Sequence, residues 1–196
     1  MAKTAATGFY PRGNLLGGAN TPPSYDYIIA NSVTIKIGDA LLINEAGFVR
    51  RSAAGEPILG VCVGLVDVNG INVFSPRASG TTGSTLTPDD TLATSSTNQS
   101  DAVRNLKAQI QLDPAGLLLY YNDADADLAA TNDFQFYDSS AAGNQITGST
   151  NLDTNGQWQL VKRDPDGDAD LSKGLFRINE SQMNAGLDSA TDKIPA

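Results

Sequence analysis

The pattern with the clearest chemical meaning is an acidic run near the C-terminus, which reads Asp164-Pro165-Asp166-Gly167-Asp168-Ala169-Asp170. Carboxylates at alternate positions resemble the first half of a calcium-binding loop, where oxygen ligands surround the ion. The match then fails, because Ala169 replaces the glycine of the sharp turn and Leu175 replaces the bidentate glutamate. A solvated acidic turn is therefore the preferred interpretation, with a bound calcium ion as the alternative. We predict no metal site and no cofactor.

The chain contains no histidine and a single cysteine, Cys62. Histidine is the usual general base near neutral pH and the commonest transition-metal ligand, so Ser-His-Asp and Cys-His catalytic groups cannot be assembled within one chain. The same shortage excludes a zinc site. Cys62 lies between Val61 and Val63, where a free cysteine usually packs as a small hydrophobic residue.

Other catalytic signatures are also missing from the sequence. It has no phosphate-binding glycine loop, no dinucleotide-binding glycine motif and no serine in a nucleophile elbow. Paired carboxylates for glycoside hydrolysis remain possible, but that chemistry needs a carboxyl group in an apolar pocket and aromatic platforms for sugar. The aspartates lie in polar turns instead, and the only tryptophan, Trp158, lies in a predicted strand. We therefore expect that the protein is not an enzyme.

The charge balance restricts the class of partner. The 196 residues carry a net charge of −9, and an acidic surface repels both nucleic-acid backbones and anionic membranes. No stretch is long and apolar enough to predict a membrane-spanning helix, and the N-terminus lacks the apolar core of a signal peptide. We expect a protein made in the cytoplasm that binds neither nucleic acid nor membrane.

Residues 1–27 are predicted to form an extended N-terminal arm, because prolines and glycines interrupt any helix and no strand-length alternation appears. The arm is nevertheless rich in apolar and aromatic side chains, which a free tail would expose. Two alternatives account for this: the arm is covered by its own domain, or by a neighbouring subunit. The residues predicted to contact a partner are Phe9, Tyr10, Pro11, Arg12, Leu15 and Leu16.

Residues 28–182 are predicted to form one all-β domain of nine or ten short strands. Alternating or β-branched runs separated by turn residues support this prediction. The runs cover residues 28–37, 40–43, 48–51, 58–66, 71–74, 103–112, 117–121, 134–137, 157–163 and 174–179. Strands this short and this closely spaced are typical of a small β-barrel or β-sandwich.

Two features of this domain have more than one interpretation. Residues 103–112 contain helix formers, but their period of two favours a strand. Gly60 and Gly64 in an apolar run indicate a β-bulge or a close approach of another backbone. Residues 78–101 are predicted to be a long loop, and residues 183–196 a C-terminal tail.

Several stretches resemble the β-rich core of the head decoration (cement) proteins of tailed bacteriophages. They are Gly38-Asp39-Ala40-Leu41, Gly47-Phe48-Val49 and Ala54-Gly55-Glu56-Pro57-Ile58-Leu59-Gly60-Val61-Cys62-Val63-Gly64. The resemblance covers residues 28–75 well and residues 103–180 loosely. It implies a β-tulip-like barrel or sandwich without catalytic residues. It also implies a homo-oligomer, expected to be a trimer, bound over joints of the major capsid protein lattice.

The leading hypothesis is therefore a virion structural protein that decorates and stabilises the capsid surface. Two alternatives stay open: a phage tail or baseplate module, and a β-sandwich adhesin that binds carbohydrate or calcium. The lack of catalytic motifs and the apolar arm favour the leading hypothesis, because an arm that orders on a neighbouring subunit gains a wide contact area.

Overall fold

The computed structural model confirms an all-β fold. It describes residues 8–17, 24–30, 33, 35–45, 47–66, 107–128, 134–140, 145–148, 152, 156–163 and 171–183, together with the backbone of residues 85–86. Within these ranges the regular elements are short β-strands, and none of the described residues is helical.

Most strands belong to two antiparallel five-stranded sheets. The first sheet has the order β1 (Tyr10–Asn14), β9 (Leu118–Asp123), β12 (Lys173–Ile178), β11 (Trp158–Arg163) and β10 (Phe136–Tyr137). The second has the order β2 (Ser24–Ile28), β8 (Lys107–Leu112), β6 (Gly60–Val66), β4 (Ala40–Ile43) and β5 (Val49–Arg51). A separate pair joins β3 (Ile35–Lys36) to β7 (Thr85–Leu86).

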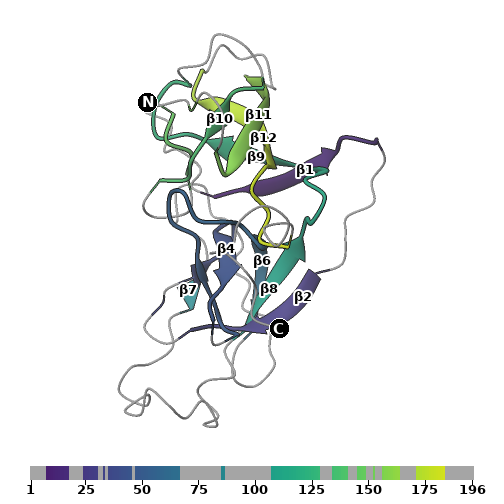
Figure 1. Cartoon of the computed structure of the whole chain (residues 1–196), viewed down its shortest axis with the longest axis vertical. Coiled ribbons are helices and arrows are strands. Elements are labelled where there is room, and N and C mark those ends of the chain that lie inside the picture. Colours follow the sequence, from purple (N-terminus) through teal and green to yellow (C-terminus); the bar gives the residue numbers. More distant parts are fainter. Residues whose placement is uncertain are drawn as a thin grey trace.

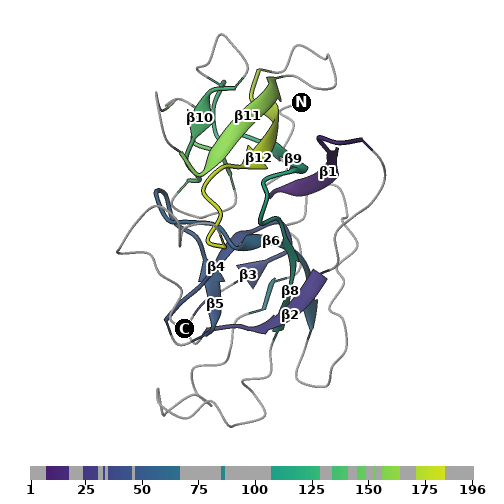
Figure 2. The ribbon, with the colours of Figure 1, turned by 45° about the vertical axis from the view of Figure 1, so that its right-hand side comes forward.

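The two sheets lie one above the other along the long axis of the molecule (Figures 1 and 2). The chain passes between them after β1 and again between β8 and β9, so each sheet contains strands from distant parts of the sequence. Among the described residues, the one bridge between the edges of the second sheet is the parallel bridge of Ile29 with Val49. A sandwich therefore describes the architecture better than a closed barrel.

The strand predicted over residues 103–112 is confirmed for residues 107–112. Ala108 and Ile110 are fully buried while Lys107 and Gln109 are half-buried, as a period of two predicts, but the alternation fails after Ile110, where Gln111 is buried and Leu112 is half-buried. The predicted single strand over residues 28–37 is wrong. Ile28 is the last residue of β2, which begins at Ser24 and pairs with β8, and only Ile35 and Lys36 of the predicted run belong to β3, so two strands stand where one was predicted.

Both glycines of the apolar run have the role predicted for them. The register between β6 and β8 shifts between Cys62 and Gly64, which is the β-bulge expected there. A Cβ atom at Gly60 would overlap the carbonyl oxygen of Gln111 on β8, so the two backbones approach too closely for any side chain.

Two hydrophobic clusters stabilise the fold. One lies mostly on the first sheet around the fully buried Trp158, and also contains Val61 and Ile58 from the other half of the chain. The other lies within the second sheet around Leu41 and Ile110. Because Val61 lies on β6 of the second sheet, apolar contacts within the first cluster hold the two sheets together.

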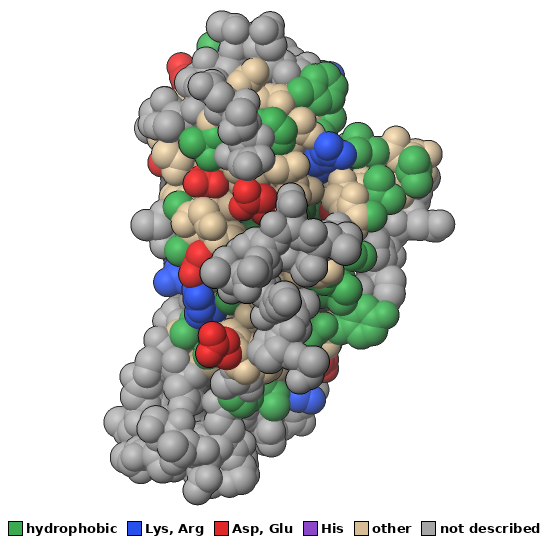
Figure 3. All heavy atoms as spheres, in the orientation of Figure 1, with side chains coloured by type: hydrophobic (Ala, Val, Ile, Leu, Met, Phe, Trp, Pro, Cys, Tyr) green, Lys and Arg blue, Asp and Glu red, His purple; other side chains and the backbone are tan. Residues whose placement is uncertain are grey.

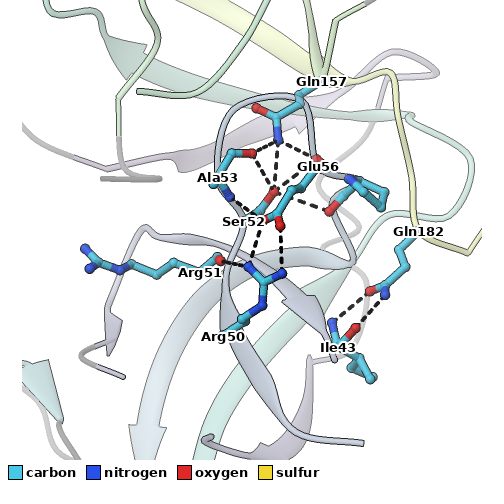
Figure 4. A network of polar contacts seen from close by, with 9 residues as sticks. Ile43, Arg50, Arg51, Ser52, Ala53, Glu56, Gln157 and Gln182 are labelled. Atoms are coloured by element: carbon cyan, nitrogen blue, oxygen red, sulfur yellow. Dashed lines mark hydrogen bonds and ion pairs between the residues drawn. The ribbon is translucent and has the colours of Figure 1, made fainter. Parts of the chain in front are cut away.

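A polar network joins the sheets beside this apolar contact (Figure 4). The side-chain amide of Gln157, which precedes β11, donates to Ser52 Oγ at 2.9 Å and to the carbonyl oxygens of Ala53 and Glu56 in the second half of the molecule. Gln182 exchanges two hydrogen bonds with the backbone of Ile43, at 2.8 and 2.7 Å. These side-chain amides hydrogen-bond to partly buried backbone groups and so link the two halves of the molecule.

Candidate docking surface on the N-terminal segment

The segment predicted to be an extended arm is bound to the rest of the chain. β1 pairs with β9, and β2 pairs with β8 along its whole length. Before β1, the Phe9 amide donates to the Gly38 carbonyl at 2.7 Å, and the Asn122 side chain donates to the Gly8 carbonyl at 3.0 Å. Its own domain therefore covers this part of the predicted arm.

Phe9 is a core residue, so its prediction as a partner contact is corrected. Its side chain is fully buried and stacks on the indole of Trp158, with ring centroids 3.9 Å apart and planes 10° from parallel. Tyr120 packs edge-on against the same indole at 5.7 Å. A partner cannot reach Phe9 while the chain is folded, and nothing in the sequence pairs these distant rings.

Gly8 and Gly38 explain how Phe9 enters the core. Both have a left-handed backbone, with φ of 131° and 95°, and a Cβ atom on Gly38 would lie 2.9 Å from the Cα of Gly8. Only glycine tolerates this conformation and this contact without strain. This close contact between Gly8 and Gly38 fixes the direction of the chain just before β1.

β1 is the outer strand of the first sheet and presents part of its surface to solvent. Tyr10 is half-buried, whereas Pro11 and Arg12 are exposed. The register with β9 shifts between Pro11 and Gly13, and the Arg12 guanidinium lies 5.1 Å from the centroid of the Tyr121 ring. Stacking of a guanidinium on an aromatic face holds both side chains in one orientation.

The turn after β1 holds two leucines outward. Leu15 is 42% exposed and Leu16 is 78% exposed. The Leu15 amide donates to the Leu117 carbonyl at 2.9 Å, and the Leu16 amide donates to Asn14 Oδ1 at 2.9 Å. The backbone is thus fixed by hydrogen bonds while the side chains remain accessible to a partner.

β2 adds an aromatic residue that the predicted contact set omitted. Tyr25 is 51% exposed, and β1 and β2 lie on the same side of the molecule in both ribbon views. Figure 3 shows hydrophobic side chains gathered along this side. We call this surface the arm flank, which consists of Pro11, Arg12, Leu15, Leu16 and Tyr25. The abundance of aromatic residues in the arm was the available signal for Tyr25, but its exposure was not predictable.

Two titratable side chains near the N-terminal segment, Cys62 and Asp39, are buried and out of reach of a substrate in solution. The Cys62 thiol is buried and lies near Asp39, and both effects raise its pKa, so the reactive thiolate is disfavoured. Burial also raises the pKa of Asp39 to about 7, and Asp39 Oδ1 has no hydrogen-bond partner. Across the described ranges, no three His, Cys, Asp or Glu side chains form a group suited to a metal ion.

The raised pKa of Asp39 predicts a stability that depends on pH. Between the unfolded pKa of 3.8 and the folded pKa of about 7, the folded state binds more protons, so stability falls as pH rises. Asp39→Asn removes this titration and retains the acceptor for the Lys36 amide. The free energy of unfolding of Asp39→Asn relative to wild type should increase by about 3 kcal/mol from pH 5 to pH 8 in denaturant titrations. A difference independent of pH would contradict the assignment.

Some predicted features lie outside the described residues. They are the acidic run at residues 164–170, the strand at residues 71–74, residues 184–196 of the tail, and the loop at residues 78–101 apart from β7. The calcium alternative therefore stays a sequence hypothesis. Within the described ranges, no helix has the length and apolar character needed to cross a membrane.

Comparisons with known proteins identify no relative of this chain. No family model, no curated protein sequence and no solved structure matches it.

Proposed function

We propose that this chain is a structural protein of a tailed-phage head, which binds over joints of the major capsid protein lattice and stabilises the shell. The observation that carries the proposal is the arm flank, where apolar side chains and an arginine stand exposed on hydrogen-bonded backbone. The resemblance of residues 38–64 to cement proteins supplies the kind of partner. The protein acts by binding and has no substrate to convert.

The arm flank suits docking because its backbone is already ordered. Phe9 in the core and the pairing of β1 with β9 fix the strand before any partner arrives. A surface that is rigid in the free state loses little conformational entropy on binding, so more of the contact energy contributes to affinity.

The residue types of the arm flank also suit a protein interface. Tyrosine and arginine are enriched among the residues that dominate binding energy, and the stacking of Arg12 on Tyr121 orients the charge. The exposed leucines add apolar area that a partner can cover. A trimer on a three-fold position of the shell belongs to the same proposal, and the mass in solution decides that part.

Removing residues 1–27 would be a poor test, because it deletes Phe9, β1 and most of β2 and would unfold the domain. The sharper test is the double variant Leu15→Ser and Leu16→Ser in the full chain, with binding to isolated capsid shells measured by co-sedimentation. Loss of two apolar contacts should weaken binding about ten-fold or more while the melting temperature stays unchanged.

Leu171→Ser is the matched control, because Leu171 is 40% exposed and lies two residues before β12, a strand that pairs with β9 and β11 and with neither β1 nor β2. It should bind shells as wild type does. Equal binding by the double variant would remove the arm flank from the proposal. Wild-type protein that ignores shells, or that labels only tails in electron micrographs, would overturn the proposed function itself.

A further inference from the structure

In the part of the chain that the structure describes, the outer edge of β2 has no paired strand. Its five residues pair with β8 in continuous register from Ser24 opposite Gln111 to Ile28 opposite Lys107. On the other side, no backbone hydrogen bond from residues 24–28 to another strand is found in the described part of the chain, and the next bridge joins Ile29 to Val49. An open strand edge is a template for one further strand.

The outer edge of β1 has protective features that β2 lacks. Pro11 has no amide hydrogen to donate, and the register shift beside Arg12 interrupts the strand. Proline, a bulge and a cationic side chain are the usual means of blocking an open edge. β2 contains no proline and no register shift, so it is the strand of this flank that has the geometry for strand addition.

The position of Tyr25 shows where the second sheet is incomplete. Tyr25 lies opposite Ile110, so both side chains point to the core face, yet Ile110 is fully buried and Tyr25 is half exposed. Tyr27, on the same face, packs against the core cluster. A strand added beyond β2 would place an apolar residue next to Tyr25 and extend this core.

Asp26, the central residue of β2, determines which kind of strand can pair with the open edge. Asp26 is exposed and lies on the face opposite to Tyr25, with Gln109 as its neighbour on β8. A second copy pairing through all five residues of β2 would place Asp26 directly opposite Asp26, which is unfavourable. A lysine or arginine at that position of a partner strand would be attracted, as would any cationic segment to a chain of net charge −9.

We propose that β2 binds an extended segment of a partner protein as an added strand, with a lysine or arginine opposite Asp26 and apolar residues beside Tyr25. The identification of the partner as a capsid subunit rests on the proposed function. The residue types expected in the added strand do not depend on it. The backbone of β2 supplies affinity, and Asp26 and Tyr25 supply selectivity.

The test uses two capped peptides, Ser-Val-Lys-Val-Lys-Val-Ser and its counterpart with glutamate at both lysine positions. Each is titrated into the full, isotope-labelled chain while backbone amide chemical shifts are recorded by NMR. We expect shifts concentrated in residues 24–28 and binding of the lysine peptide about five-fold tighter than that of the glutamate peptide. Asp26→Lys should reverse this order, and Tyr25→Ser should weaken both peptides.

Asp127→Lys is the control for general electrostatic attraction, because Asp127 is exposed, lies beyond β9 and changes the net charge equally. It should leave the five-fold preference in place. The inference is overturned if neither peptide shifts residues 24–28, if both bind equally, or if Asp26→Lys leaves the order unchanged. Peptide selectivity in a protein that ignores capsid shells would retain the strand-addition site and reject only the phage-head function.

Discussion

Replacing Phe9 by alanine should lower the free energy of unfolding by about 3–5 kcal/mol, the usual cost of deleting a fully buried aromatic side chain. Phe9 has no exposed surface and stacks on Trp158 at 3.9 Å, so the substitution leaves a cavity at the centre of the first cluster. The measurement is chemical denaturation followed by tryptophan fluorescence, which reports directly on the affected indole.

Leu16→Ala is the matched control within the same segment. Leu16 is 78% exposed, so its truncation should change stability by no more than about 0.5 kcal/mol. The pair separates the structural and the binding parts of the N-terminal segment. If Phe9→Ala is as mild as Leu16→Ala, Phe9 does not belong to the core, and the assignment of the segment to its own domain is wrong.

Gly60→Ala should destabilise the second sheet by about 3 kcal/mol or more. The added Cβ atom would overlap the backbone carbonyl oxygen of Gln111 and lie 2.8 Å from Ile110 Cγ2. Relief requires the β6 and β8 backbones to separate, which weakens hydrogen bonds in the interior of the sheet and disturbs the packing of Ile110. Thermal unfolding followed by circular dichroism measures the effect.

Gly64→Ala provides the comparison on the same strand. Its added Cβ atom would overlap only Oε1 of Gln109, at the end of a flexible side chain that can rotate away. We expect a loss below about 1 kcal/mol for this substitution. Equal losses at Gly60 and Gly64 would show that the spacing between the β6 and β8 backbones does not limit stability.

The strands that the sequence predicted best are those with one buried face. In residues 107–110 of β8 and in β11 around Trp158 and Leu160, the alternating burial follows directly from the geometry of a pleated strand. The glycines of β6 were equally predictable, because glycine within a strand marks a bulge or a close backbone. These inferences need only local spacing, so they are accessible without the fold.

The N-terminal segment was harder to interpret because its two strands lie at sheet edges. β1 contains Pro11 and a register shift, which remove the alternation that would reveal a strand. In β2, Tyr27 packs against the core cluster, whereas Ser24, Tyr25 and Asp26 are exposed. The division between Phe9 inside and Leu16 outside is invisible in a sequence where both are simply apolar. Only the exposure in the folded chain distinguishes the core residue from the surface residue.

The sequence alone determined the all-β class, the apolar setting of Cys62 and the presence of a bulge or a close backbone at the glycines of β6, since each depends on residue type and nearest spacing. Tertiary structure alone decided that Phe9 completes the Trp158 cluster, that Asp39 is buried with a raised pKa, and that Leu16 and Tyr25 are exposed. The physical reason is that these side chains are covered or exposed by parts of the chain that are distant in the sequence, and local spacing does not indicate which distant parts come together.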